Sequence, residues 1–108
     1  MERDRPLSTE AQTLTFHREA LAELREAARY YGARLPQLGE YFVAEVRRVT
    51  ALVALRPAIG ASMALGRQRW LCGRFPYAVV YRVAPDGSIR ILPFAHHRRR
   101  PGYWRLRT

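Results

Sequence analysis

A turn signal between two apolar segments constrains the fold of this chain most strongly. Pro85-Asp86-Gly87-Ser88 combines residue types that favour tight turns. Residues 75–83 before it alternate between two faces, and one face carries Phe75, Tyr77, Val79, Tyr81 and Val83. Residues 89–94 after it are almost entirely apolar. This pattern predicts two antiparallel strands joined by a hairpin turn.

The second of these strands is predicted to lie inside a sheet. Apart from Arg90, both of its faces are apolar, as expected for a strand that is buried on two sides. Pro93 has no backbone N–H to donate, so we expect a bulge or the end of the strand near it. Tyr77 and Tyr81 fall on the apolar face of the first strand, which is typical of core aromatics.

Upstream of these strands, the apolar positions follow helical spacing twice. The first apolar face consists of Ala20, Leu21, Leu24, Ala28 and Tyr31. Gly32 and Pro36 end this helix, and Pro36 can begin the next one, which stops before Pro57. The stripe of the second helix consists of Leu38, Phe42, Val46, Val49 and Val53. The short link between the two predicts an antiparallel helical hairpin whose stripe packs on a sheet.

Two further strands complete the expected sheet. Leu14-Thr15-Phe16 is short and β-prone, and residues 67–72 alternate with strand spacing, whereas residues 58–66 have the composition of a loop. The expected order is β-α-α-β-β-β, an α+β fold with the helical hairpin on a mainly antiparallel sheet. We assign residues 11–108 to this single domain and residues 1–10 to a flexible N-terminal arm.

The positive charge is concentrated in the C-terminal half of the chain. The net charge is +10, and residues 55–108 hold eleven Arg against one acid, Asp86. Such a basic half predicts an anionic partner, either nucleic acid or an acidic protein. The longest apolar run is only a few residues, so we expect no membrane span. A single cysteine, Cys72, fits a reducing cytoplasm.

Arginine and aromatic side chains are the candidates for binding an anion. The expected target- or anion-binding residues are Arg67, Arg69, Arg74, Arg82, His96, Arg98, Arg99, Arg100, Tyr103 and Trp104. The bland alternatives are a solvated charge run at residues 98–100 and a hydrogen-bonded His96 at a strand end. No metal-ligand spacing or glycine-rich phosphate loop is present, so we expect neither a metal nor a cofactor.

A metal-independent nuclease is one chemistry that these side chains can support. It needs a base to activate a ribose hydroxyl, an acid for the leaving oxygen and cations for the developing charge. The candidates for these roles are Arg82, His97 and Tyr103.

A series of short motifs resembles a known superfamily. They are Leu14-Thr15-Phe16-His17-Arg18-Glu19-Ala20, Glu23-Leu24, Tyr30-Tyr31, Leu38-Gly39, Phe42, Arg56-Pro57, Arg74-Phe75-Pro76-Tyr77, Val80-Tyr81-Arg82, His96, Arg98-Arg99, Pro101 and Tyr103-Trp104. Over residues 14–107 the chain resembles the RelE/ParE superfamily of toxins from bacterial type II toxin–antitoxin systems. It looks most like the ParE-like, plasmid-stabilisation branch.

The resemblance implies both a fold and partners. The fold is the one deduced above, and the activity is toxicity to the producing cell, neutralised by a small ParD- or RelB-like antitoxin that is acidic where it meets the toxin. The complex is expected to bind operator DNA. Tyr41 flanks the stripe of the second helix, and we expect the antitoxin to contact Tyr41, Arg47 and Arg48.

The superfamily contains two branches with different targets. RelE-like members cut mRNA on the ribosome, and ParE-like members poison DNA gyrase. The lysines that RelE-like members use are absent, whereas Phe75-Pro76-Tyr77 looks ParE-like. We therefore expect a growth-inhibiting gyrase poison that is not an enzyme. The alternatives are a ribosome-dependent mRNA endonuclease, and a non-toxic module that binds nucleic acid or the antitoxin.

Overall fold

The computed structural model describes residues 11–108 of the chain, so the expected arm at residues 1–10 lies outside the described part. Strand β1 (Leu14–Phe16) is followed by helices α1 (Arg18–Arg34) and α2 (Pro36–Leu55). Strands β2 (Ala61–Met63), β3 (Arg67–Leu71), β4 (Tyr77–Val83) and β5 (Ile89–His96) come next. They form one sheet in the order β1-β5-β4-β3-β2. Only β1 and β5 pair in parallel, which confirms the predicted α+β fold.

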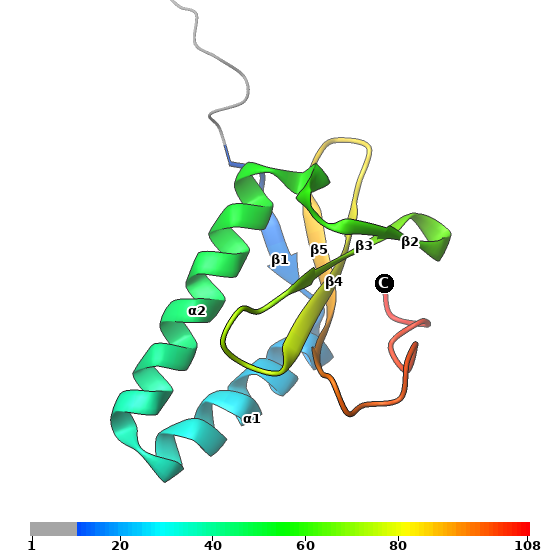
Figure 1. Ribbon diagram of the computed structural model, residues 1–108. Coiled ribbons are helices and arrows are strands. Elements are labelled where there is room, and N and C mark those ends of the chain that lie inside the picture. The colour runs from blue at the N-terminus through cyan, green and yellow to red at the C-terminus, as the bar shows by residue number, and fades with distance from the viewer. Residues whose placement is uncertain (1–10) are drawn as a thin grey trace, which may run out of the picture.

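The helical hairpin packs on one side of the sheet (Figure 1). The side chain of His17 accepts a hydrogen bond from the backbone N–H of Glu19 and so caps the start of α1. Leu35 is extended between the two helices, and Pro36 begins α2 as predicted. The helices meet closely at their linked ends, where a Cβ on Gly39 would lie 2.8 Å from the Cα of Gly32. Glycine at this position therefore permits the tight hairpin.

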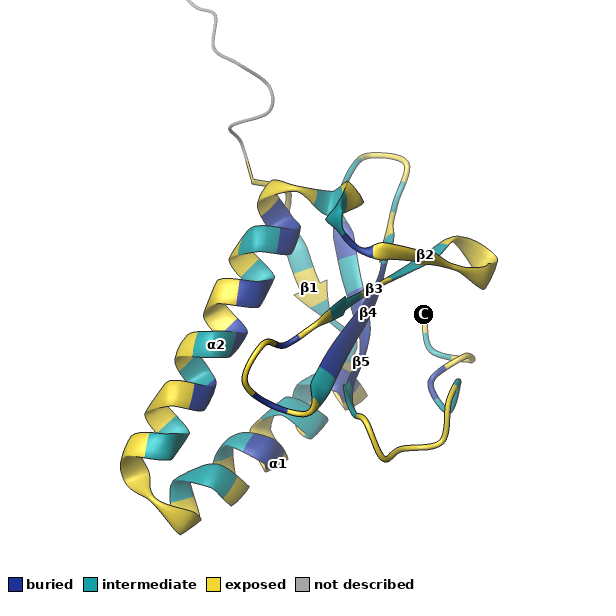
Figure 2. Ribbon diagram, in the orientation of Figure 1, coloured by how far each residue is buried: buried dark blue, intermediate teal, exposed yellow. Residues whose placement is uncertain are grey.

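The main core lies between the helices and the sheet (Figure 2). Four of the five predicted stripe residues of α2 are buried, and Leu38 is half-buried against them. Tyr81 is fully buried, and its hydroxyl donates to the carbonyl of Pro57 at 2.7 Å and accepts from the N–H of Gly60 at 2.9 Å. The phenol is satisfied by backbone groups, so Tyr81 is a structural residue, as its position predicted.

The predicted irregularity at Pro93 is a bulge in β5. Val79 pairs with Phe94 and Tyr81 pairs with Ile91, so two residues of β5 lie opposite one residue of β4. The strand continues past the bulge to His96, two residues beyond its expected end. The burial on both faces of β5 is also confirmed, because Leu92 lies in a second apolar cluster on the side away from the helices.

The segment 58–66 was expected to be a loop and contains the short edge strand β2 between two turns of 3₁₀ helix. All three residues of β2 are exposed, and they pair only with β3. An exposed edge strand has no buried face, so it leaves no apolar alternation in the sequence. Over residues 11–108, no helix is long and apolar enough to span a membrane.

Candidate functional site

The C-terminal tail, residues 97–108, returns across the side of the sheet that the helices leave open (Figure 1). Trp104 anchors it, because its side chain is buried against Val80 of β4 and Leu92 of β5. Trp104 was expected on a binding surface, but the structure places it in this second core. Burial of one indole on a small apolar patch holds the tail in a fixed position.

Glu23 of α1 binds the same tail through Tyr103 and Arg107. Its carboxylate accepts hydrogen bonds from the Tyr103 hydroxyl at 2.9 Å and from both terminal nitrogens of Arg107 at 3.0 Å. It also accepts from the backbone N–H of Phe94 at 3.0 Å, and Arg99 lies 3.8 Å away. The Glu23 and Arg107 side chains are only 16% and 12% exposed. This bidentate ion pair between Glu23 and Arg107 links the first helix to the C-terminal tail.

The sequence analysis assigned no role to Glu23 or Arg107. A signal for Glu23 was present, since it lies between the buried Ala20 and Ala27 on the inner side of α1. A carboxylate on a buried face needs a cationic partner. The pattern of residues could not show which of the eleven arginines in the second half of the chain would supply it.

The Tyr103 side chain contacts three charged residues. The Arg99 guanidinium lies 3.8 Å from the centre of its ring, the Arg107 guanidinium lies 5.1 Å from it, and its hydroxyl donates a hydrogen bond to Glu23. Burial and the contact with Glu23 raise the pKa of Tyr103 to about 12. Near neutral pH the phenol therefore keeps its proton and donates a hydrogen bond to Glu23, and it is poorly suited to act as a general base.

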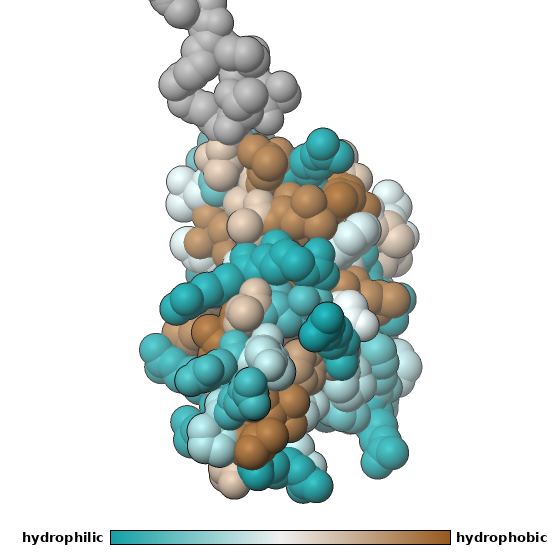
Figure 3. All heavy atoms as spheres, turned by 60° about the vertical axis from the view of Figure 1, so that its left-hand side comes forward, coloured by the Kyte–Doolittle hydropathy of each residue, from teal (hydrophilic) through white to brown (hydrophobic). Residues whose placement is uncertain are grey.

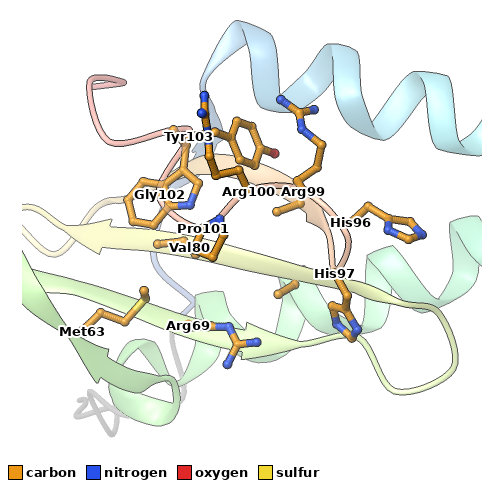
Figure 4. A pocket seen from close by; sticks show the side chains of 13 residues that line it. Met63, Arg69, Val80, His96, His97, Arg99, Arg100, Pro101, Gly102 and Tyr103 are labelled. Atoms are coloured by element: carbon orange, nitrogen blue, oxygen red, sulfur yellow. The ribbon is translucent and has the colours of Figure 1, made fainter.

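A cavity of about 310 Å³ lies between the tail and the sheet (Figure 4). Its apolar floor includes Ala78 and Val80, and its polar lining includes Arg69, His97 and Arg100. Both His96 and His97 line this cavity, their side chains point in different directions (Figure 4), and the His96 ring lies edge-on to Tyr77. Burial, together with the charges of Arg98 and His97, lowers the pKa of His96.

Three arginines occupy neighbouring positions across the sheet. Arg82 pairs with Arg67 of β3 on one side and with Arg90 of β5 on the other. Directly opposed residues on adjacent strands lie on the same face and a few ångströms apart. Within residues 11–108, none of the three is in an ion pair with a carboxylate. Arg82 does not line the cavity that contains His97 and Tyr103, so the three nuclease candidates do not share one pocket.

The remaining predicted basic residues lie elsewhere. Arg98 lines a second pocket of about 540 Å³ between α1 and the end of β5, together with Tyr30, Tyr77 and Glu26, and Arg99 lines both this pocket and the cavity beside the tail. Arg74 lies beside α2 in a shallow hollow with Tyr41 and Arg48. The predicted anion-binding residues therefore lie on several surfaces, one of which is the face that carries the tail.

The helical hairpin presents a different surface. Apolar side chains emerge between polar ones on this face (Figure 3). Tyr41 is 51% exposed, and Arg47 lines a hollow of about 420 Å³ between α1 and α2 that also includes Val43. Arg48 is engaged with Glu45 through hydrogen bonds of 3.0 and 2.7 Å. All three expected antitoxin contacts are exposed, and Arg48 is in addition held in an ion pair with Glu45.

No metal centre is apparent in the described residues, since residues 11–108 contain no group of three or more His, Cys, Asp or Glu side chains that could hold an ion. Cys72 is buried, and burial raises the pKa of its thiol to about 11. The protonated thiol is a poor nucleophile, so Cys72 is a core residue.

Comparisons with known proteins agree with this architecture. The family model described as the ParE toxin of the type II toxin–antitoxin system parDE matches residues 14–101. Among curated proteins, none gives a significant match to the chain. A solved chain of the chromosomal ParDE toxin–antitoxin system from P. aeruginosa has a similar fold, with a TM-score of 0.67 and 20% identity. The match covers 80% of this chain and 96% of that one.

Proposed function

The chain belongs to the ParE toxin family of type II toxin–antitoxin systems, and we propose that it stops growth by poisoning DNA gyrase until a cognate antitoxin neutralises it. The basic face that carries the tail is the target-binding surface in this proposal, and the helical hairpin is the antitoxin-binding surface. The two surfaces lie on opposite sides of the sheet. An acidic antitoxin suits a chain with a net charge of +10.

The contact between Tyr103 and Glu23 is the observation that favours a protein target over RNA cleavage. A tyrosine that serves a metal-independent nuclease must reach the reacting ribose or phosphate. The Tyr103 hydroxyl is instead committed to Glu23, and its ring is flanked by Arg99 and Arg107. This supports a structural role for Tyr103 and a toxin that acts by binding.

A ribosome-dependent mRNA endonuclease is the second candidate, and one observation favours it. Arg69, His97 and Arg100 gather around one cavity, where a histidine and two guanidiniums can hold a phosphate and transfer a proton. The lining of the cavity holds no acidic side chain, so a histidine is the group there that could transfer a proton.

Pulse labelling after induced expression without antitoxin separates the candidates. An early fall in DNA synthesis with a DNA-damage response is expected if gyrase is the target. An early fall in protein synthesis with cut messages would favour the nuclease. An unaffected growth rate, with soluble folded protein present, would contradict both toxin functions and leave a non-toxic binding module. Expression of Trp104→Ala, which removes the anchor of the tail, serves as the matched inactive control.

A further inference from the structure

Arg67 and Arg82 lie side by side on the face of the sheet that carries the tail. They are direct partners across β3 and β4, and neither lines any of the cavities described above. Val80, two residues before Arg82 on β4, packs on Trp104 of the tail and so identifies this face. Directly opposed side chains on adjacent strands have Cβ atoms about 5 Å apart. The two guanidiniums can therefore converge on one bound group.

The positive charges of this pair are not balanced within the described chain. Like charges directly opposite one another destabilise a sheet. Within residues 11–108, neither Arg67 nor Arg82 is in an ion pair with a carboxylate. Asp86, the one acidic residue of the second half of the chain, accepts hydrogen bonds from the N–H and the hydroxyl of Ser88 instead. Both arginines are half-buried, so water screens their repulsion incompletely.

Arg90, on the other side of Arg82, differs because its donors are in use. Its Nη1 donates to Oγ1 of Thr15 at 3.2 Å and to the carbonyl of Phe16 at 3.0 Å. Its Nε donates to a main-chain oxygen of Thr108 at 3.3 Å. These bonds fix Arg90 between β1 and the tail. It adds positive charge beside the pair, whereas Arg67 and Arg82 are the groups available to bind an anion.

Arg67 also has a donor without an acceptor. Its Nη1 donates to the carbonyl of Leu65 at 2.8 Å, and this bond holds the guanidinium in place. Its Nε is buried and has no hydrogen-bond partner in the described part of the chain. Unpaired buried donors are uncommon in folded proteins, and each one calls for an explanation. An anion between Arg67 and Arg82 would supply the missing acceptor and offset the repulsion of the two charges.

A phosphate dianion matches this pair better than other biological anions. It carries close to two negative charges near neutral pH and has several acceptor oxygens, so it can balance both guanidiniums and accept hydrogen bonds from both. A carboxylate carries one charge and would leave one arginine unbalanced. The backbone of a nucleic acid carries one charge per phosphate, and these charges are spread along the strand. The two cations of this pair instead meet at one place.

We propose that Arg67 and Arg82 form a binding site for a phosphate dianion, either free phosphate or the terminal phosphate of a nucleotide. Arg90 flanks the site as a fixed positive charge. This site is separate from the cavity that contains His97, and it goes beyond the function proposed above, because the isolated chain can bind phosphate with neither gyrase nor antitoxin present.

Nuclear magnetic resonance of the purified, isotope-labelled full-length chain tests the site, because the Nε–H group of each arginine gives its own signal. Inorganic phosphate at constant ionic strength is expected to shift the Arg67 and Arg82 signals until they saturate. Dimethyl phosphate has the same tetrahedral centre with a single charge and is expected to bind at least about tenfold more weakly. Equal effects of phosphate, dimethyl phosphate and acetate would overturn the proposal, since they would show only a general attraction of anions.

Arg82→Gln separates binding from stability. Without phosphate, its midpoint of thermal unfolding is expected to equal or exceed that of the parent chain, because a like-charge contact is removed. Phosphate is expected to raise the midpoint of the parent chain and not that of the variant, whose phosphate affinity falls by about tenfold or more. Arg29→Gln, exposed on α1, loses the same charge and is expected to keep the phosphate response. Equal responses of the two variants would contradict the site.

Two further measurements complete the test. Arg67→Gln is expected to lose phosphate binding as Arg82→Gln does, and it tests the site even if Arg82→Gln fails to fold. Adenosine monophosphate distinguishes the sources of the phosphate group. Tighter binding than that of inorganic phosphate would identify a nucleotide as the ligand, and equal affinity would identify phosphate itself. Adenosine that binds as tightly as its monophosphate would overturn the proposal, because the phosphate would then contribute nothing.

Discussion

The hydroxyl of Tyr103 lies 2.9 Å from Oε2 of Glu23, although the two residues are 80 positions apart in the sequence. The contact joins the C-terminal tail to the first helix, and Arg107 binds the same carboxylate with two nitrogens. The tail therefore has a defined position over the sheet, and the basic groups along it keep fixed positions relative to the cavity. The predictions below test that arrangement.

Replacing Glu23 by Gln is expected to destabilise the fold. Glutamine can still accept from the backbone N–H of Phe94, but it leaves Arg107 with only 12% exposure and without its main counter-charge. Loss of a charged, largely buried hydrogen-bond pair predicts a decrease of about 2 kcal/mol in the free energy of unfolding. Urea denaturation measures this, with the exposed Glu26→Gln as control, and equal stabilities of the two variants would contradict the role of Glu23.

Tyr103→Phe is expected to remain toxic. The change removes the hydroxyl that donates to Glu23 and keeps the ring between its two arginines, so we expect a loss of about 1 kcal/mol in stability. Growth after induction measures toxicity. Loss of toxicity in a variant that remains folded by circular dichroism would instead support a catalytic hydroxyl.

Stability is expected to fall in alkaline solution. The pKa values of Tyr103 and Tyr77 are both raised to about 12, chiefly by burial, whereas an unfolded tyrosine loses its proton near pH 10. Between these values the unfolded state binds fewer protons, so this contribution is fully present below about pH 10 and is lost as the pH rises through about 12. Unfolding midpoints across this range are expected to fall less steeply for Tyr103→Phe than for the parent chain.

Two substitutions on the basic face are expected to abolish growth inhibition. Arg69→Ala with Arg100→Ala removes two guanidiniums of the cavity beside the tail, and neither makes a hydrogen bond or ion pair within residues 11–108. We therefore expect unchanged thermal unfolding together with normal colony formation after induction. Persistent toxicity would show that the target binds elsewhere.

Substitutions on the helices are expected to weaken antitoxin binding and to leave toxicity unchanged. Tyr41→Ala with Arg47→Ala alters the exposed hairpin surface and should weaken binding of the cognate antitoxin by about tenfold while leaving toxicity intact. Titration calorimetry with the antitoxin measures the change. If affinity is unaffected, the antitoxin contacts lie on another face.

Local patterns predicted most of the fold, because they reflect burial of one face at a time. The periodicity of the apolar residues was enough to predict α2 and β4. The missing N–H of Pro93 was enough to predict the bulge. Strand β2 has no buried face and so carries no such pattern.

The candidate site was less predictable, because its contacts join distant parts of the chain. Glu23 and Arg107 pair over 84 positions, and periodicity says nothing of such pairs. Trp104 illustrates the same difficulty. Its place among arginines suggested a binding surface, but the exposed side of the sheet needed an apolar cover and Trp104 supplies it.

The parallel pairing of β1 with β5 has a consequence for the order of events during synthesis. Leu14 pairs with Ile89, and the carboxylate of Glu23 receives its cation from Arg107. The first strand and the Glu23 carboxylate thus acquire these partners only after almost the whole described chain has left the ribosome. A nascent chain that has emerged only as far as the helical hairpin has neither sheet nor tail, so the working surface forms late. An antitoxin that is already present can meet the toxin as soon as it folds.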